Sequence, residues 1–124
     1  MSRARQAAVA VAALRIAYGA GLVAAPAALA KNWLGPDGTR PPAGVALRAL
    51  GAREVLLFGG AIAALLRDEA ARPWLIAGVA GDLFDIAATA GAASHLPQGA
   101  APKTAAIAGA SALIGAGVAA ALER

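Results

Sequence analysis

The chain of 124 residues contains no cysteine, a single histidine and few aromatic or charged residues. The absence of cysteine excludes disulfide bonds, thiol catalysis and cysteine-based metal sites. Charged residues make up 15% of the sequence, against about 25% in a typical soluble domain. A disordered chain is excluded as well, because disorder requires low hydrophobicity and high charge. The formal net charge is +4, but the basic residues form no dense patch, so we expect no nucleic-acid partner.

Metal and cofactor chemistry also lacks the residues that it would need. The one histidine, His95, has no second histidine near it and only distant carboxylates. The sequence contains no Ser-His-Asp set, no P-loop and no dinucleotide-binding fingerprint. We therefore expect neither a metal site nor a cofactor.

Hydrophobic residues, in contrast, make up 60% of the chain, and the mean hydropathy is +0.66. Arginine, proline and glycine divide them into four apolar segments of about 19–25 residues, at 6–30, 44–66, 73–96 and 104–122, each long enough to cross a hydrocarbon core of ~30 Å. The last segment has no charge between Lys103 and Glu123, so it lacks the polar face of a soluble amphipathic helix. Four such helices cannot all be central in a soluble bundle of this size. The sequence predicts an all-α, integral membrane four-helix bundle that forms one domain, residues 1–124.

The connections between the segments predict the topology. Short loops favour an antiparallel, up-and-down order of neighbouring helices. Five basic residues outside the spans fall on one side of the membrane and three on the other: Arg3, Arg5, Arg67, Arg72 and Arg124 against Lys31, Arg40 and Lys103. Because cytoplasmic loops are enriched in basic residues, we expect both termini in the cytoplasm.

The first segment resembles a secretory signal, since Arg3 and Arg5 precede an apolar stretch that ends in Ala28-Leu29-Ala30. Arg15 interrupts that stretch, so we interpret the segment as a retained helix. Pro26 predicts a kink or an early end of this helix. Trp33 lies just outside the segment, where indole rings form interfacial belts.

Six ionisable residues lie inside the proposed spans: Arg15, Arg48, Arg53, Glu54, Asp82 and Asp85. In the second span, the ten large apolar residues favour membrane insertion by only about 3–6 kcal/mol of free energy. Its three charged residues oppose insertion by roughly 7–10 kcal/mol. We therefore expect an interior network in which Arg15 and Arg53 pair with Asp82 and Asp85, and Glu54 is either paired with an arginine or protonated. Arg48 lies nearer the membrane surface, where it could snorkel.

Two interpretations of this network stay open. Such a network could only specify which helix packs against which, because a wrong pairing would strand a charge. Alternatively, ionisable groups inside a membrane line paths or sites for a ligand. The residues that we expect around a ligand are Arg15, Tyr18, Arg48, Arg53, Glu54, Asp82, Asp85 and Thr89.

Three elements of the sequence carry a resemblance to a known group of proteins. They are Arg15…Gly19…Pro26…Trp33-Leu34-Gly35, then Arg48-Ala49-Leu50-Gly51-Ala52-Arg53-Glu54…Gly59, and Gly81-Asp82-Leu83-Phe84-Asp85. Over nearly its whole length the chain resembles a family of small bacterial four-span membrane proteins known only as a domain of unknown function. More broadly it is similar to the DoxX-like four-helix membrane proteins. The resemblance implies a multi-pass protein of the bacterial plasma (inner) membrane and implies no particular activity.

The leading functional hypothesis is a polar cavity that binds a small or lipophilic ligand, or that docks a membrane partner. Lipid is one expected partner, and a homodimer or a larger membrane complex is another. The first alternative is a membrane enzyme for isomerisation, cyclisation or epoxide opening, with Asp82 or Asp85 as base, the other carboxylate or Glu54 as acid, and Arg53 as charge stabiliser. The second alternative is a small proton-coupled transporter.

Overall fold

A computed structural model describes residues 1–122 of the chain. Its five α-helices are α1 (Arg3–Ala24), α2 (Pro26–Leu34), α3 (Pro41–Leu66), α4 (Arg72–Gly91) and α5 (Ala100–Leu122). Two short 3-10 turns, η1 (Gly35–Thr39) and η2 (Ala93–His95), complete the structure, and residues 1–122 contain no strand. The all-α prediction is therefore confirmed. Arg124, which entered the predicted orientation, lies outside the described residues.

Four of these helices, α1, α3, α4 and α5, are long and apolar enough to cross a membrane. Their outer faces carry large apolar side chains that nothing in residues 1–122 covers, among them Leu56, Leu83, Phe84 and Leu113. An exposed apolar surface of this extent is suited to lipid rather than to water. The helices thus support a multi-pass membrane protein built as a helical bundle.

The helix ends differ from the predicted spans where proline acts on the backbone. The first predicted segment, 6–30, is divided between α1 and α2, because Ala25 leaves the helical conformation and Pro26 starts a new helix. The third, 73–96, stays helical only to Gly91, and Leu96 is extended before Pro97. The other two begin earlier than predicted, at Pro41 and Ala100, since proline is tolerated in a first helical turn, whose N–H groups have no partner within the helix.

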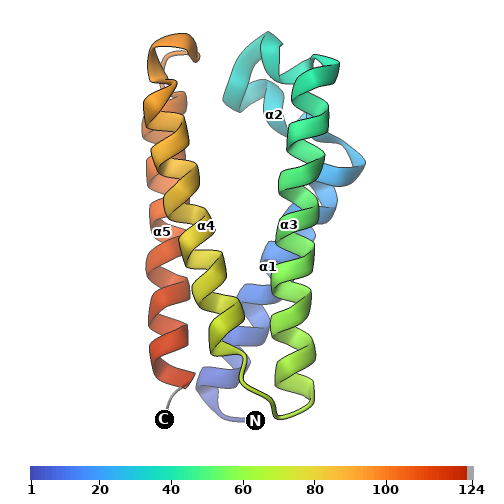
Figure 1. Ribbon diagram of the computed structural model, residues 1–124, viewed down its shortest axis with the longest axis vertical. Helices are drawn as coiled ribbons and strands as arrows, with labels where there is room; N and C mark the ends of the chain where they lie inside the picture. Colours follow the sequence, from blue (N-terminus) through green and yellow to red (C-terminus); the bar gives the residue numbers. More distant parts are fainter. Residues whose placement is uncertain (123–124) are drawn as a thin grey trace.

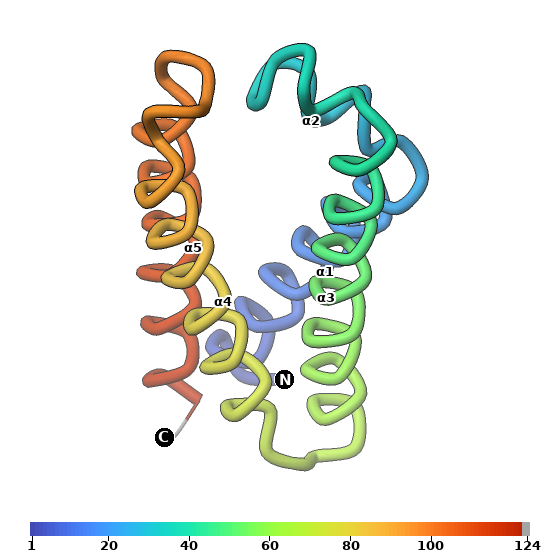
Figure 2. The backbone as a smooth tube through the Cα atoms, turned by 45° about the horizontal axis from the view of Figure 1, so that its top comes forward, coloured from blue at the N-terminus to red at the C-terminus, as the bar shows by residue number. Residues whose placement is uncertain are grey.

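The long helices form two pairs, α1 with α3 and α4 with α5 (Figure 1). The pairs lie close together at the end that holds both chain termini and the α3–α4 connection, and they diverge toward the other end. Figure 2 shows α2 at that diverging end, on the side of α1 and α3. The backbones of the two pairs therefore lie closer together at one end of the molecule than at the other.

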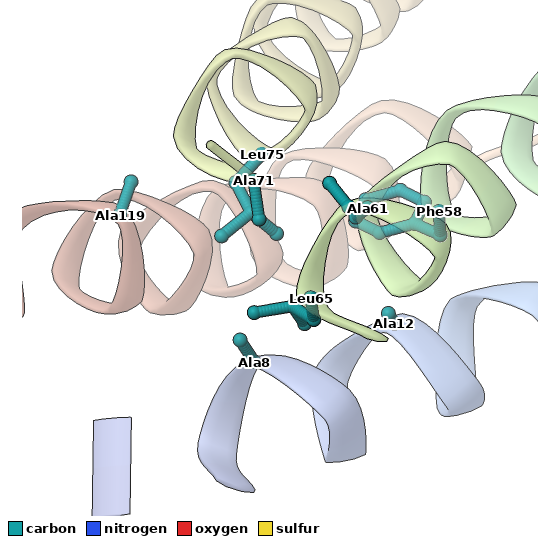
Figure 3. Close-up of a cluster of buried hydrophobic side chains, with 9 residues drawn as sticks. Ala8, Ala12, Phe58, Ala61, Leu65, Ala71, Leu75 and Ala119 are labelled. Carbon is teal, nitrogen blue, oxygen red and sulfur yellow. The ribbon is translucent and has the colours of Figure 1, made fainter. Parts of the chain in front are cut away.

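An apolar core closes the narrow end. It combines small and large buried side chains of the four long helices and the residue before α4: Ala8, Ala12, Phe58, Ala61, Ala64, Leu65, Ala71, Leu75 and Ala119 (Figure 3). Alanine at the contacts lets the helices approach closely, and close packing is what associates helices in lipid. A second, smaller cluster of Leu22, Ala30 and Leu47 holds α2 against α1 and α3.

Candidate functional site

Two glycines bring the middle of α1 against the middle of α3. A Cβ atom on Gly19 would lie 2.6 Å from the carbonyl oxygen of Gly51, and one on Gly51 would lie 2.5 Å from the carbonyl oxygen of Gly19. Only glycine at both positions allows the two backbones to pass this closely. Arg15 lies one turn from Gly19, and Glu54 lies about one turn from Gly51. The glycine contact therefore sets the two charged side chains against each other.

Arg15 joins three helices through four hydrogen bonds of its guanidinium group. Its Nε and Nη2 donate to the two carboxylate oxygens of Glu54 on α3, at 2.8 and 2.9 Å. Its Nη1 and Nη2 donate to the two oxygens of Asp82 on α4, at 3.0 and 2.6 Å. Both carboxylates are buried, with 2% and 4% of the residue surface exposed. Paired fork contacts of this kind are the strongest ionic contacts that arginine makes.

A residue of the apolar core, Phe58, contacts the ion pairs that Arg15 forms with Glu54 and Asp82. The guanidinium carbon of Arg15 lies 4.6 Å from the centroid of the Phe58 ring, which belongs to the buried core. An aromatic face at this distance attracts the cation electrostatically. The ring itself lies against Gly78 of α4.

Arg53 forms a second ion-pair centre beside the first. Its Nη1 and Nη2 donate to the two oxygens of Asp85 on α4, at 3.3 and 2.9 Å, and Nη2 also donates to Glu54 at 3.3 Å. The guanidinium group lies over Gly81, where a Cβ atom would be 3.2 Å from its central carbon. Glu54 therefore links the two arginines, and the five side chains make one continuous cluster. We call Arg15, Arg53, Glu54, Asp82 and Asp85 the charge cluster.

The charge cluster is not electrically balanced by its own members. It contains two guanidinium groups and three carboxylates, so one formal negative charge is unmatched when all five groups are ionised. Arg48, which would complete a neutral set of six, is exposed and donates its Nε–H to the backbone carbonyl of Val23. The imbalance is a property of the folded arrangement that the sequence count did not show.

A cavity of about 450 Å³ lies directly beside the cluster, within the range of small-molecule sites. Its floor consists of Arg15, Glu54, Asp82 and Asp85. Large apolar side chains, Leu14, Leu29, Leu50 and Ile107, line its walls. Asp85 is the most open of the three acids in the floor, with 29% of its side chain exposed.

The far rim of the cavity joins α2 to α5. The indole Nε1–H of Trp33 donates to the hydroxyl of Thr104 at 2.8 Å, and the ammonium group of Lys103 donates to the backbone carbonyl of Asn32 at 3.2 Å. All four residues line the cavity. Sequence reasoning missed this rim, because Trp33 was interpreted as an interfacial anchor. The signal available in the sequence was a short segment between Pro26 and Gly35 with polar residues at its end.

The structure brings together most, but not all, of the residues expected around a ligand. Five of them line the cavity: Arg15, Tyr18, Glu54, Asp82 and Asp85. Arg53 does not line it but donates a hydrogen bond to Asp85. Arg48 and Thr89 do not belong to it. Arg48 lines a separate surface depression near Gly44, and the Thr89 hydroxyl donates to the backbone carbonyl of Asp85, one turn earlier in its own helix.

The arrangement suits ionic and hydrogen-bond recognition rather than metal binding. Among residues 1–122, no group of three or more histidine, aspartate or glutamate side chains is arranged to hold a metal ion. The carboxylates face guanidinium groups instead. A polar floor below apolar walls can hold the polar end of a molecule whose remainder is apolar.

No family model matches the chain, and no curated protein or solved structure matches it either.

Proposed function

We propose that this multi-pass membrane protein binds a small molecule that has an apolar body and one polar end. The observation that carries the proposal is the cavity of about 450 Å³, which has aliphatic walls and a floor of ionisable side chains. Ionisable groups within a membrane are expensive, and they mark ligand or ion sites more often than lipid-facing surface. A network that served packing alone would not need a cavity above it.

The ligand enters this cavity sideways from the bilayer in our proposal. Leu14 on α1 and Ile107 on α5 line the cavity, and they are 72% and 64% exposed. Side chains that are both lining and exposed mark the mouth of a cavity. An apolar mouth between two spanning helices opens onto lipid, so lipophilic molecules dissolved in the membrane are the natural occupants.

We also propose the antiparallel, up-and-down order with both termini in the cytoplasm of a bacterial plasma membrane. The position of the α3–α4 connection beside both chain ends supports the order (Figure 1). Arg3, Arg5, Arg67 and Arg72 at that end support the orientation by their number. The α2 segment and the rim at Lys103 then face the opposite side. The likeness to DoxX-like proteins stays part of this proposal and rests on the glycine and charge motifs alone.

A membrane enzyme is the second candidate, favoured by the exposure of Asp85 into the cavity. All three carboxylates accept hydrogen bonds from arginine, but Glu54 and Asp82 are buried, whereas Asp85 keeps 29% of its side chain exposed. Asp85 would then be the general base, and the Tyr18 hydroxyl on the cavity wall would be the group nearest in kind to an acid.

Ligand binding is tested by filling the cavity. Ala108 lines it, so Ala108→Phe should block it, while Ala116→Phe places the same ring on an exposed position of the same helix. The purified protein in lipid nanodiscs should be stabilised against heat by members of a panel of membrane-soluble compounds, since a ligand that binds only the folded state raises the melting temperature. The Ala116→Phe variant should keep that response and Ala108→Phe should lose it. A parent protein that responds to no compound, or a response that survives Ala108→Phe, contradicts the proposal.

A further inference from the structure

The unmatched negative charge of the charge cluster bears on which ligand the cavity takes. Two arginines cannot neutralise three carboxylates, and a charge is costly to hold in a low-dielectric region. An occupant that brings one positive charge would balance the cluster. An occupant with a negative charge would double the imbalance.

The hydrogen-bond geometry agrees with this preference. The three nitrogens of Arg15 that face Glu54 and Asp82 are all already donating, so an anion in the cavity would find few free guanidinium donors. Arg53 does not line the cavity. Asp85, in contrast, lines the cavity and keeps 29% of its side chain exposed while Arg53 holds it from the α3 side. Among the charged groups of the cavity floor, the one that stays open to a ligand is therefore the carboxylate of Asp85.

Lys103 is the one other cationic group in the lining, and it belongs to the rim rather than the floor. Val79 of α4 contacts Gly115 of α5, so in an antiparallel pair Asp85 lies near the level of residue 108 or 109. Lys103 is then roughly 8 Å further along the axis. Its ammonium group is exposed and engaged with the backbone carbonyl of Asn32.

Aromatic side chains in the lining add to the case for a cation. Tyr18 and Trp33 both line the cavity. The faces of tyrosine and tryptophan rings attract ammonium groups, and such rings are used in proteins to recognise quaternary ammonium ligands. Aliphatic walls, aromatic rings and an open carboxylate together match one chemical class.

We infer that the cavity binds a cationic amphiphile, an aliphatic chain with a protonated amine or quaternary ammonium group, whose charge lies against Asp85. This inference rests on the proposed ligand-binding function and specifies the class of the ligand. The apolar chain occupies the space between Leu14, Leu50 and Ile107, and it reaches the cavity from the bilayer through the α1–α5 mouth.

Three probes of equal length separate charge from hydrophobicity: decylamine, decanol and decanoate. Binding is followed in nanodiscs of zwitterionic lipid by the fluorescence of Trp33, which lines the cavity, in a Trp74→Phe background that removes the other tryptophan. We expect decylamine to bind about tenfold or more tightly than decanol, and decanoate to bind more weakly than both. Asp85→Asn makes the cluster neutral, so it should remove the preference for the amine and leave decanol binding unchanged. The matched control is Asp37→Asn, which removes an exposed carboxylate outside the cavity and should keep the preference.

The outcomes separate this inference from the proposed function. Equal or tighter binding of decanol or decanoate, blocked by Ala108→Phe, overturns the cationic class and leaves a ligand-binding cavity. A preference for the amine that persists in Asp85→Asn places the charge effect elsewhere and also overturns the inference. If none of the three probes binds the parent protein, both the inference and the proposed cavity function fail.

Discussion

The ring of Phe58 fits against α4 only because residue 78 is glycine. A Cβ atom on Gly78 would lie 2.6 Å from the Cζ atom of Phe58, which is closer than real Cβ atoms come to their neighbours. The centroid of the same ring lies 4.6 Å from the guanidinium carbon of Arg15, so a shift of the ring would also change its contact with that cation. Gly78 thus determines how closely the Phe58 ring approaches α4, and with it the position of the ring relative to Arg15.

Gly78→Ala should destabilise the protein by about 1–3 kcal/mol, the usual effect of overpacking a core. Adding Phe58→Leu to the same chain should restore part of the loss, since the shorter side chain leaves room for the new methyl group. The matched control is Gly59→Ala, because nothing lies within 4 Å of a Cβ atom at that position of α3. The melting temperatures of all three variants are measured by thermal unfolding in detergent. Equal melting temperatures for Gly78→Ala and Gly59→Ala would show that the ring is not held where we describe it.

Removal of Arg15 should be among the most destabilising single changes in the chain. Arg15→Ala leaves the buried Glu54 and Asp82 without the cation that binds both, and breaking a buried ion pair on one side costs about 3–5 kcal/mol. Arg48→Ala is the control, since its guanidinium group is exposed and donates to a backbone carbonyl rather than to a buried carboxylate. We expect it to cost about 1 kcal/mol or less. If the two alanine variants unfold at the same temperature, water rather than Arg15 stabilises the carboxylates.

Much of the fold follows from the sequence because composition and length determine it. Four apolar segments of spanning length indicate lipid as their surroundings, and the structure has four helices long and apolar enough to span it. The division at Pro26 follows from the chemistry of proline. The divergence of the two helix pairs could not be predicted, because alanine-rich helices look alike on every face and give no periodicity that identifies a partner.

For the candidate site, the sequence predicts which residues form the cluster but not which of them pair with each other. Charges in the middle of spans need partners, so a cluster of Arg15, Arg53, Asp82 and Asp85 could be predicted. The choice of partners could not, because three carboxylates were available to each arginine. Arg48 was included for its place inside a predicted span, but in the structure its side chain donates to the backbone carbonyl of Val23 instead.

The orientation in the membrane is open to a direct test, since the chain has no cysteine to interfere with labelling. Asp68→Cys lies in the α3–α4 connection, and Asp37→Cys lies in the η1 turn beyond α2. In intact cells, a maleimide reagent that cannot cross the membrane should label the cysteine at position 37 and not the one at 68. Both should be labelled after the cells are broken. Labelling of position 68 in intact cells would reverse the orientation inferred from the basic residues.

The two aspartates of α4 share one helix face but differ in their surroundings. Asp82 is 4% exposed and receives two bonds from Arg15, whereas Asp85 is open to the cavity and receives its bonds from Arg53. Asparagine keeps the shape of either side chain and removes its charge. Asparagine at position 82 should therefore lower the stability of the fold, and asparagine at position 85 should weaken ligand binding.

Asp82→Asn should lower the melting temperature more than Asp85→Asn, by an amount corresponding to about 2 kcal/mol or more, because it removes one side of a buried ion pair from Arg15. Asp85→Asn should unfold closer to the parent protein, since the pair of Asp85 with Arg53 is partly exposed to solvent and such pairs contribute less to stability than buried ones. The second readout is the stabilisation by bound decylamine, which the parent should show and Asp85→Asn should lack, because an amide cannot balance an ammonium group. Asp37→Asn controls for the loss of a carboxylate as such. Equal destabilisation by the two α4 variants, with no response of the parent to decylamine, would mean that the five charges serve only to hold the helices together.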